Sequence, residues 1–278
     1  MSLGFEIKRL ENQKDNDLTN LKPPLKWAGG KRWLLPHLLP ILQKFENKRL
    51  VEPFCGGLAV ALGLKPKQAL LNDINALVIN FYKRLQFGLQ TTLTMANNET
   101  LYYQYRLRLN DLITSGNIDG SESAELFYYL NRSGYNGLSR FNSKGQFNVP
   151  FGRYKTINYL QDFSGYKEIF KNWQFSACDF EQLIIQSNDI VYADPPYDVQ
   201  FTKYAKEDFT WLDQERLANW LGQLNVPIIV SNQATIRIVK LYKKIGFKIK
   251  KLSAPRMISC NGNRDEALEI LAFKNINN

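Results

Sequence analysis

Hydrophobic positions along this chain follow two alternating patterns. Short apolar runs bounded by Gly, Pro, Asn or Asp indicate buried strands, and apolar residues spaced three and four apart indicate amphipathic helices. The runs predict strands at residues 49–54, 68–72, 173–177, 189–193, 226–230, 247–252 and 267–273. The helical spacing predicts helices at residues 32–42, 58–64, 74–87, 101–113, 124–130, 212–224 and 235–245. Strands that alternate with helices predict an α/β fold with a doubly wound, mostly parallel sheet.

The last two strands and the middle of the chain depart from this alternation. The last two strands are expected to form a closing antiparallel hairpin, which mixed sheets commonly carry at an edge. Residues 91–166 change to aromatic-rich helical stretches and then to a segment rich in Gly, Asn and Arg. We expect an inserted, mainly helical domain with a β-hairpin there, within an α/β domain made of residues 21–90 and 167–278. The polar residues 1–20 are expected to be a disordered lead-in.

The composition favours a soluble globular protein with a polyanionic partner. The chain has 278 residues, with 36 Lys and Arg against 26 Asp and Glu, and a net charge of +10. Nucleic acid is the first candidate for such a partner. We expect a cytoplasmic protein, because no apolar run approaches the length of a membrane span and the polar start lacks the apolar centre of a signal peptide.

Cysteine and histidine usage excludes several kinds of site. The three cysteines, Cys55, Cys178 and Cys260, are far apart and odd in number, so neither a disulfide framework nor a paired-cysteine metal site is predicted. His37 is the only histidine, which excludes zinc sites built from several imidazoles and most Ser-His-Asp triads. We therefore expect no metal cofactor.

The most specific motif is Asp194-Pro195-Pro196-Tyr197, directly after the strand predicted at 189–193. Open α/β sheets bind their ligands at the carboxyl ends of strands. A Pro-rich turn without chemistry is the alternative interpretation.

These four residues supply what methylation of an exocyclic amine on a base requires. Such an amine is a poor nucleophile, because its lone pair is delocalised into the ring. The Asp194 carboxylate and the Pro195 carbonyl can each accept one amine proton, which localises the lone pair and stabilises positive charge on nitrogen. Two successive prolines stiffen that carbonyl. Tyr197 offers a flat face for stacking on a base turned out of a duplex.

A second motif fits a cofactor that carries adenosine. Glycines follow Phe54 at a predicted strand-to-helix turn, in the sequence Glu52-Pro53-Phe54-Cys55-Gly56-Gly57. Asp73 comes about 20 residues after Phe54, a spacing at which a carboxylate can bind ribose hydroxyls. A purely structural glycine turn is the alternative. The sequence has neither a G-x-G-x-x-G nor a P-loop motif, which disfavours a dinucleotide or an ATP phosphate.

Two further segments are candidates for ligand contacts. Residues 23–31 lead into the first predicted helix, and either a cofactor contact or a plain loop fits them. Residues 131–155 hold no acidic residue and alternate Arg, Lys, Asn and aromatic side chains with glycines. Arginine can bind guanine edges or phosphates, asparagine can pair with adenine, and an aromatic or Leu wedge can part stacked bases. A solvated hairpin is the alternative.

Along the chain the four segments follow the order 23–31, 52–57, 131–155 and 194–197. With that order, from about residue 24 to residue 272, the chain resembles the Dam-type, GATC-modifying DNA adenine methyltransferases. The resemblance implies a Rossmann-like catalytic domain that depends on S-adenosyl-L-methionine, with 91–166 as its target-recognition domain. The implied reaction, of the EC 2.1.1.72 type, methylates a flipped adenine in duplex GATC and leaves S-adenosyl-L-homocysteine.

The resemblance also implies roles for individual residues. The implied catalytic residues are Asp194, Pro195, Pro196 and Tyr197. The implied cofactor-binding residues are Trp27, Lys31, Phe54, Gly56, Asp73, Asp179, Phe180 and Asp194. The expected DNA-binding residues are Lys26, Tyr135, Asn136, Leu138, Arg140, Pro150 and Arg153, with Arg132 added from the basic segment. Residues 258–264 resemble the family's loop before the last strand.

The family gives the DNA-binding residues different roles. Lys26 matches the contact to the first guanine, and Arg153 matches a phosphate contact. Tyr135 and Asn136 match the residues that wedge at and hold the target base pair. The rest of GATC is matched to Leu138, Arg140 and Pro150.

The chain departs from the family pattern at two places. The glycine motif ends in Gly56-Gly57-Leu58 rather than Gly-x-Gly, so one position of close backbone approach carries Leu58, which bears on cofactor affinity. Ser231-Asn232-Gln233 stands where bacterial members often have Ser-Asn-His, which leaves the role of Gln233 open.

Several other functions share part of this sequence pattern. Methylation of a cytosine amine or of adenine in RNA is the nearest, although cytosine enzymes of this type more often carry Ser before Pro-Pro-Tyr. A zinc deaminase needs His and paired Cys ligands that the sequence lacks. A DNA-binding protein without catalysis would not need Asp194 or Trp27. We expect a monomer that acts on double-stranded DNA at the nucleoid of a bacterial or phage-infected cell, with or without a restriction-modification system.

Overall fold

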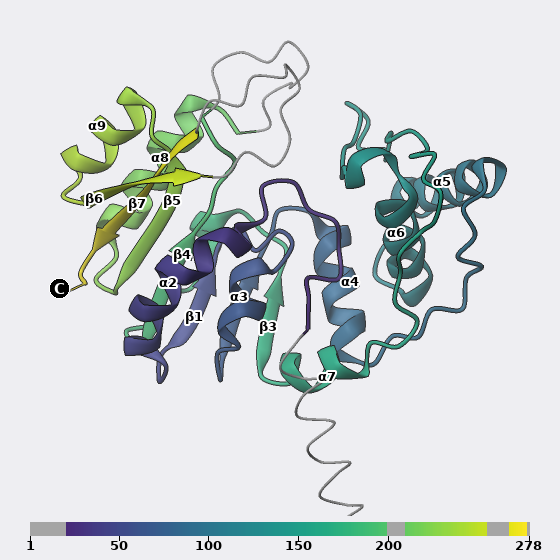
Figure 1. The fold of residues 1–278 in the computed structure, drawn as a ribbon, viewed down its shortest axis with the longest axis horizontal. Helices are drawn as coiled ribbons and strands as arrows, with labels where there is room; N and C mark the ends of the chain where they lie inside the picture. Colours follow the sequence, from purple (N-terminus) through teal and green to yellow (C-terminus); the bar gives the residue numbers. More distant parts are fainter. Residues whose placement is uncertain (1–20, 199–208, 255–266, 277–278) are drawn as a thin grey trace, which may run out of the picture. The chain divides into compact units, whose positions relative to one another are not determined.

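The computed structural model describes residues 21–198, 209–254 and 267–276 (Figure 1). The expectations for residues 1–20 and 258–264 lie outside the described residues.

The strands are β1 (Arg49–Glu52), β2 (Ala69–Asn72), β3 (Trp173–Ser176), β4 (Asp189–Ala193), β5 (Ile228–Gln233), β6 (Lys248–Ala254) and β7 (Ala267–Lys274). The α-helices are α2 (Leu35–Leu42), α3 (Ala59–Leu64), α4 (Ala76–Gln86), α5 (Glu99–Thr114), α6 (Ser121–Ser133), α7 (Ser164–Phe170), α8 (Trp211–Gln223) and α9 (Ile236–Lys244). Short 3-10 helices are η1 (Lys31–Leu34), η2 (Gln43–Phe45), η3 (Tyr135–Gly137) and η4 (Phe180–Gln182).

The chain divides into two compact units. Of the described residues, unit 1 holds those within Met1–Lys31, Gly56–Lys65 and Asn75–Phe175, and unit 2 holds those within Arg32–Cys55, Pro66–Ile74 and Ser176–Asn278. This grouping differs from the predicted domain boundaries, because α3 and α4 fall in the same unit as residues 91–166. That residues 91–166 form a target-recognition insert stays a prediction.

The sheet has seven strands in the order β3-β2-β1-β4-β5-β7-β6. Strand β1 pairs in parallel with β2 and β4, and β4 pairs in parallel with β5. Strand β7 is antiparallel to both β5 and β6. The predicted α/β class, with a mostly parallel sheet and a closing antiparallel hairpin, is therefore confirmed. The chain leaves β1 in one direction and returns to its other side at β4, which makes the carboxyl ends of these two strands a switch point of the kind that binds ligands.

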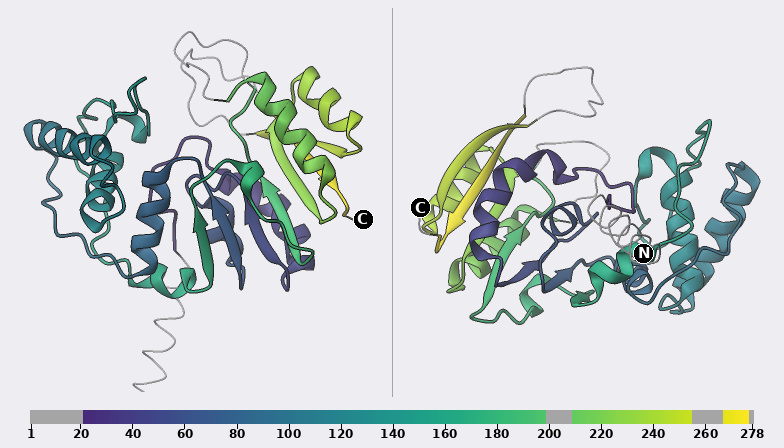
Figure 2. Two further views of the ribbon diagram at one scale, coloured as in Figure 1. Left: turned by 180° about the vertical axis from the view of Figure 1, so that it is seen from behind. Right: turned by 60° about the horizontal axis from the view of Figure 1, so that its bottom comes forward.

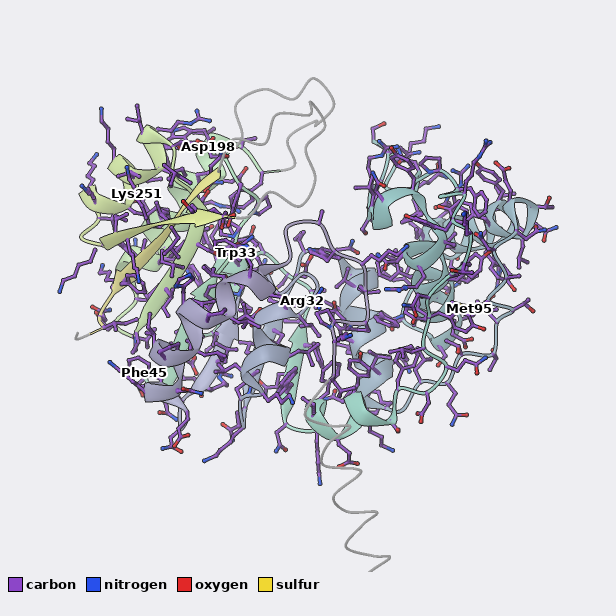
Figure 3. The ribbon with its side chains drawn as sticks, viewed as in Figure 1. Arg32, Trp33, Phe45, Met95, Asp198 and Lys251 are labelled. Atoms are coloured by element: carbon purple, nitrogen blue, oxygen red, sulfur yellow. The ribbon has the colours of Figure 1, made fainter. Side chains whose placement is uncertain are left out.

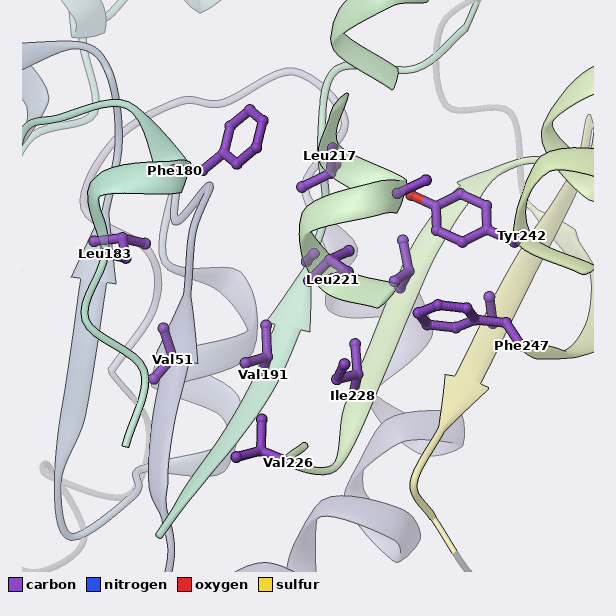
Figure 4. Packing of buried hydrophobic residues seen from close by; sticks show 14 of the residues in the cluster. Val51, Phe180, Leu183, Val191, Leu217, Leu221, Val226, Ile228, Tyr242 and Phe247 are labelled. Atoms are coloured by element: carbon purple, nitrogen blue, oxygen red, sulfur yellow. The ribbon is translucent and has the colours of Figure 1, made fainter. Parts of the chain in front are cut away.

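Helices of unit 2 cover both faces of its sheet. In Figure 1, α2 lies in front of the strands, and Figure 2 shows α8 and α9 on the other side. Helix α8 begins with a capping box, in which Thr210 Oγ accepts from the Asp213 N–H and the Asp213 carboxylate accepts from the Thr210 N–H. Its inner face buries Leu217 and Leu221 in one apolar cluster with Val191 of β4 (Figure 4).

Unit 1 is built around an aromatic core. Rings from α4 and α6 stack, with Phe81 and Tyr128 at 5.3 Å, and Phe163 packs edge-on against Tyr128 at 5.2 Å. The hairpin expected within residues 91–166 takes the form of a tight turn, in which Asn148 N donates to Arg140 O. Its strands are too short to be more than isolated bridges.

Candidate active site

One buried amide joins the carboxyl ends of β1, β2 and β3. The Asn72 side chain donates from Nδ2 to the carbonyl oxygens of Pro53 and Cys178, both at 2.9 Å. Its Oδ1 accepts from the Cys178 N–H at 3.1 Å. Asn72 is 1% exposed, so water does not reach its amide. These hydrogen bonds therefore take the place of water at both Nδ2 and Oδ1.

The loops anchored by this amide carry predicted cofactor residues. The Asp73 N–H donates to the Ser176 carbonyl at 3.2 Å, next to the loop of Asp179. The Phe54 and Phe180 rings lie 5.6 Å apart. Unit 2 therefore brings these four predicted cofactor residues together at one edge of the sheet.

Two members of that set also have structural partners. The Asp179 carboxylate accepts from the Glu181 N–H at 3.0 Å and pairs with Arg216 at 2.6 Å. Phe180 is buried under the Arg216 guanidinium, which lies 4.6 Å from the ring centre, and packs against Trp220. The role of Asp179 and Phe180 in cofactor binding stays a prediction.

Asp194 directly follows β4, as the sequence predicts. Its Oδ1 accepts a hydrogen bond from the Ser231 hydroxyl of β5 at 2.7 Å. The Ser231 Oγ in turn lies 2.9 Å from the Tyr192 hydroxyl. Pro195 is buried. The carboxylate is thus held by a polar network within the sheet.

The remaining residues of the Asp-Pro-Pro-Tyr segment, residues 194–197, are held by α8 and β7. Gln214 Nε2 donates to the Pro196 carbonyl at 2.7 Å, and its Oε1 accepts from Asn232 Nδ2 at 3.0 Å. The Tyr197 hydroxyl donates to Glu269 Oε2 at 2.6 Å. Burial, reinforced by nearby carboxylates, raises the pKa of Tyr197, so its hydroxyl stays protonated.

Asp198 anchors the chain just after this segment. Asp198 is labelled in Figure 3. Its carboxylate accepts from Thr235 Oγ at 3.1 Å and forms two hydrogen bonds with the Arg237 guanidinium. The Arg237 guanidinium lies 4.6 Å from the centre of the Trp211 ring. Contacts to β5, α8, β7 and the start of α9 therefore fix the backbone on both sides of Tyr197.

Trp27 and Gly56 come together in unit 1. A methyl group at Gly56, whose φ is +44°, would lie 2.6 Å from Trp27 Nε1, and one at Gly57 would lie 2.6 Å from Trp27 Cβ. Only glycine fits beneath this indole. Lys31 is 5% exposed, and its Nζ donates to the Gly29 carbonyl at 2.7 Å.

Lys26 is docked on the end of α6. Its N–H donates to Asn131 Oδ1 at 2.8 Å, and its Nζ donates to the Arg132 carbonyl at 2.7 Å. The same Nζ lies 3.8 Å over the Tyr154 ring. Burial, with a smaller effect of Arg132, lowers the pKa of Lys26 to about 8. Arg132 itself donates from Nε to the Asn158 carbonyl.

The predicted wedge residues lie on the surface of unit 1. The Tyr135 N–H donates to the Pro150 carbonyl at 2.9 Å, while the Tyr135 side chain is 51% exposed. Asn136 is exposed and adopts a left-handed backbone with φ +52°. Leu138 is half-buried just beyond them. The structure therefore places Tyr135, Asn136 and Pro150 side by side.

Arg140, predicted to contact a base, and Arg153, predicted to contact a phosphate, are both exposed. Arg140 Nε donates to Asn148 Oδ1 at 2.9 Å across the base of the tight turn. The Arg153 side chain is 79% exposed and lies 3.7 Å from Glu99, a distance at which a surface ion pair contributes little.

Sequence reasoning assigned no role to the residues that hold the Asp-Pro-Pro-Tyr segment and the loops of the predicted cofactor residues. These are Asn72, Tyr192, Gln214, Ser231, Arg237 and Glu269. One signal was available in the sequence: Ser231 and Asn232 directly follow the apolar run 226–230. A strand that continues through them buries both side chains, as the structure shows, and buried polar residues need partners.

Within the residues that the structure describes, no helix has the length and apolar character needed to cross a bilayer. The same residues contain no cluster of three or more His, Cys, Asp or Glu side chains arranged to bind a metal ion.

The mostly parallel sheet with its antiparallel β7–β6 edge is a Rossmann-like α/β fold, and it carries Asp-Pro-Pro-Tyr at the tip of β4. The model of the D12 class N6 adenine-specific DNA methyltransferases matches residues 27–258. The chain belongs to this family. Adenine in DNA is therefore its substrate class, and the family implies S-adenosylmethionine as the methyl donor.

Several relatives extend over nearly the whole chain. The DNA adenine methylase of Escherichia coli K12 is 34% identical and covers 90% of this chain and 94% of its own length. The type II methyltransferase M1.LlaDCHI of Lactococcus lactis subsp. cremoris is 36% identical, over 85% of this chain and 89% of the relative's own length. The DNA N-6-adenine-methyltransferase of Escherichia phage P1 is 34% identical over 89% of this chain, which spans only 35% of that relative.

Proposed function

We propose that this protein methylates the exocyclic amine of an adenine turned out of duplex DNA, within the sequence GATC. The observation that carries the proposal is the anchoring of the Asp-Pro-Pro-Tyr segment at the carboxyl end of β4 by Ser231, Gln214 and Glu269. A segment held in this way is preorganised to bind one small planar group in a fixed orientation.

The chemistry follows from two hydrogen-bond acceptors and one ring. The Asp194 carboxylate and the Pro195 carbonyl each accept a hydrogen bond from one N–H of the amine, which directs the nitrogen lone pair out of the plane of the base. The same acceptors stabilise the positive charge that builds up on nitrogen. Tyr197, held through its hydroxyl, presents its ring to the extruded base.

S-adenosylmethionine supplies an electrophilic methyl group on a positively charged sulfur. The chemistry of the residues at the ends of β1 and β2 fits this cofactor: Asp73 offers a carboxylate for ribose hydroxyls, and the half-buried Phe54 ring offers an apolar surface for adenine. Trp27, Lys31 and Gly56 of unit 1 stay predicted cofactor-binding residues.

Unit 1 carries the proposed DNA-reading surface. An exposed aromatic ring, Tyr135, stands beside Asn136 and Pro150, and Arg140 and Lys26 supply cations from neighbouring segments of the same unit. This mixture of a wedge, an amide and cations supports reading of base edges and separation of a base pair. The preference for GATC rests on the family resemblance alone.

The Asp194→Ala variant tests the proposal. Radiolabelled methyl transfer to matched duplexes with and without GATC should fall to background, while the dissociation constant for DNA stays within about twofold of the wild type. Mass spectrometry of the product nucleosides from the wild type identifies the methylated base. Methylcytosine, transfer to RNA, or equal loss of transfer and DNA binding in the variant would each overturn the assignment.

A further inference from the structure

Two hydroxyls on neighbouring strands and the carboxylate that directly follows β4 form a line that ends at Asp194. Tyr192 lies on β4, whose register places it beside Ile229 of β5. Its hydroxyl is 2.9 Å from Ser231 Oγ, and Ser231 Oγ is 2.7 Å from Asp194 Oδ1. Tyr192 is 2% exposed and Ser231 is 0% exposed. Two buried hydroxyls in sequence therefore connect the sheet interior to the carboxylate.

The direction of this line follows from counting protons. A serine hydroxyl has one proton, and in Ser231 that proton goes to the Asp194 carboxylate, which can only accept. Ser231 must therefore accept at its own oxygen from Tyr192. Burial, and then the nearby charges of Asp194, Glu52 and Glu269, raise the pKa of Tyr192, so its hydroxyl keeps the proton that it donates.

We propose that Tyr192 and Ser231 are positioning residues for methyl transfer, acting as a one-way hydroxyl relay that fixes the rotation of the Asp194 carboxylate. This inference rests on the proposed function, since it concerns how Asp194 receives the adenine amine. A carboxylate on a rotatable bond has to be oriented before it can accept an amine proton at a fixed angle. The relay does so before the substrate arrives, which is the preorganisation that raises a rate without tightening DNA binding.

The relay also strengthens the ionised form of Asp194. A donor to a carboxylate stabilises its charge, and Ser231 is a better donor when its own oxygen accepts a hydrogen bond, because chained hydrogen bonds polarise one another. Loss of either hydroxyl should therefore make Asp194 easier to protonate. The acid limb of the pH profile of kcat should move to higher pH, more for loss of Ser231 than for loss of Tyr192.

Three single variants of the full chain test the relay. Ser231→Ala removes the donor to Asp194, and Tyr192→Phe removes only the far hydroxyl. Tyr242→Phe is the matched control: Tyr242 is 0% exposed in the same unit, and its hydroxyl has no hydrogen-bond partner among the described residues. Each variant is checked by thermal unfolding and then assayed for kcat from about pH 4 to about pH 8, at saturating S-adenosylmethionine and GATC duplex. This range begins near the ordinary pKa of an aspartate, about 3.9, and therefore includes an acid limb that moves to higher pH.

We expect Ser231→Ala to lower kcat by about tenfold or more and Tyr192→Phe by about threefold, as for loss of hydrogen bonds to charged and neutral partners. Both should shift the acid limb, and both should keep the wild-type affinity for DNA. Tyr242→Phe should match the wild type in kcat, in the acid limb of the pH profile and in affinity for DNA.

The outcomes separate the relay from the function on which it rests. Wild-type protein that methylates no adenine overturns the proposed function. Active wild-type protein together with an unshifted acid limb in Ser231→Ala overturns the relay. If Ser231→Ala fails to fold, Tyr192→Phe decides, because a result equal to that of Tyr242→Phe would show that its hydroxyl carries no such role.

Discussion

Leu58 combines a glycine-like backbone with a fully buried side chain. Its φ is +61° and its ψ is 25°, in the left-handed region that costs an L-residue about 1–2 kcal/mol. Its side chain is 0% exposed, and burial of a leucine contributes about 1.5–3 kcal/mol. The two effects are of similar size, so the glycine motif can carry a leucine here. The departure from the family pattern adds no exposed side chain to the turn.

Lys26 gives a prediction about pH. With a pKa of about 8, its ammonium is mostly charged at pH 7 and mostly neutral at pH 9. If the charged form binds DNA, protein at high pH must take up a proton on binding, and the measured affinity for a GATC duplex should fall by about tenfold from about pH 7 to about pH 9. Fluorescence anisotropy at constant ionic strength measures this fall.

The control for this prediction is Lys26→Arg. A guanidinium stays charged over the whole range, so the variant should lose the pH dependence whatever its absolute affinity. A fall of the same size in the variant would assign the titration to another group. The same pKa shift makes a charged Lys26 unfavourable for folding, a cost that is present below pH 8 and disappears as the pH rises towards the unfolded value near 10.5.

At the scale of elements, Asn72 makes three strand ends depend on one side chain. Asn72→Asp replaces a donor by a carboxylate oxygen that faces the carbonyls of Pro53 and Cys178. We expect about a tenfold loss of affinity for S-adenosylhomocysteine, because the loops carrying Phe54 and Asp73 lose their common anchor. Isothermal titration calorimetry measures the affinity.

Asn80→Asp is the matched control. Asn80 is 2% exposed, and its Nδ2 donates to the Gly120 carbonyl and to Ser123 Oγ, both at 2.9 Å, within unit 1. Both variants should lower the melting temperature, because each places a buried carboxylate oxygen against a carbonyl oxygen that has lost its donor. Only Asn72→Asp should weaken cofactor binding, and equal weakening in both would reduce the role of Asn72 to general stability.

Most elements could be predicted from the sequence, because an apolar run between turn residues leaves few alternatives to a buried strand. Strand β5 shows the limit: it was predicted at 226–230 but is found at Ile228–Gln233. Ser231 and Asn232 near its end are polar yet buried. Asn232 bonds to Gln214, and only the fold supplies that partner. Helix α7 was not predicted, because its seven residues are held mainly by rings such as Tyr166 and Phe170 that pack on the aromatic core.

The candidate site shows the same division. Motif residues at strand ends, Asp73 and Asp194, lie where the pattern places them. The residues that hold them could not be predicted, because the contacts join distant parts of the chain: Tyr197 and Glu269 are 72 positions apart, and Asp194 and Ser231 are 37 apart. Hydrophobic periodicity carries no information about which polar side chains meet across a sheet.

At the scale of the whole molecule, a net charge of +10 predicts DNA binding that depends strongly on salt. Arg153→Ala should weaken binding to all duplexes alike and reduce the slope of log K against log salt by about 1, as expected for one lost phosphate contact. Titrations at several salt concentrations, with GATC and scrambled duplexes, measure both quantities.

Two further arginines make this prediction specific. Arg140→Ala should reduce the difference in binding free energy between GATC and scrambled duplexes by about 1–3 kcal/mol, as expected for a lost base contact. Arg108→Ala should change neither slope nor preference, because Arg108 already bonds to Glu122 at 2.6 Å. If Arg108 and Arg153 gave equal changes in slope, the effect would come from overall charge and not from a phosphate contact.

Strand β7 lies between β5 and β6 in the sheet, although it follows β6 in the chain. During synthesis on a ribosome, β6 therefore emerges without a neighbour and must wait for β7 before it can pair. Glu269, which bonds to Tyr197, is carried by this late strand. A nascent chain stalled before residue 267 would already possess Asp194 and Tyr197 but would lack the carboxylate that holds the tyrosine, so translation of β7 sets the earliest moment at which the enzyme can mature.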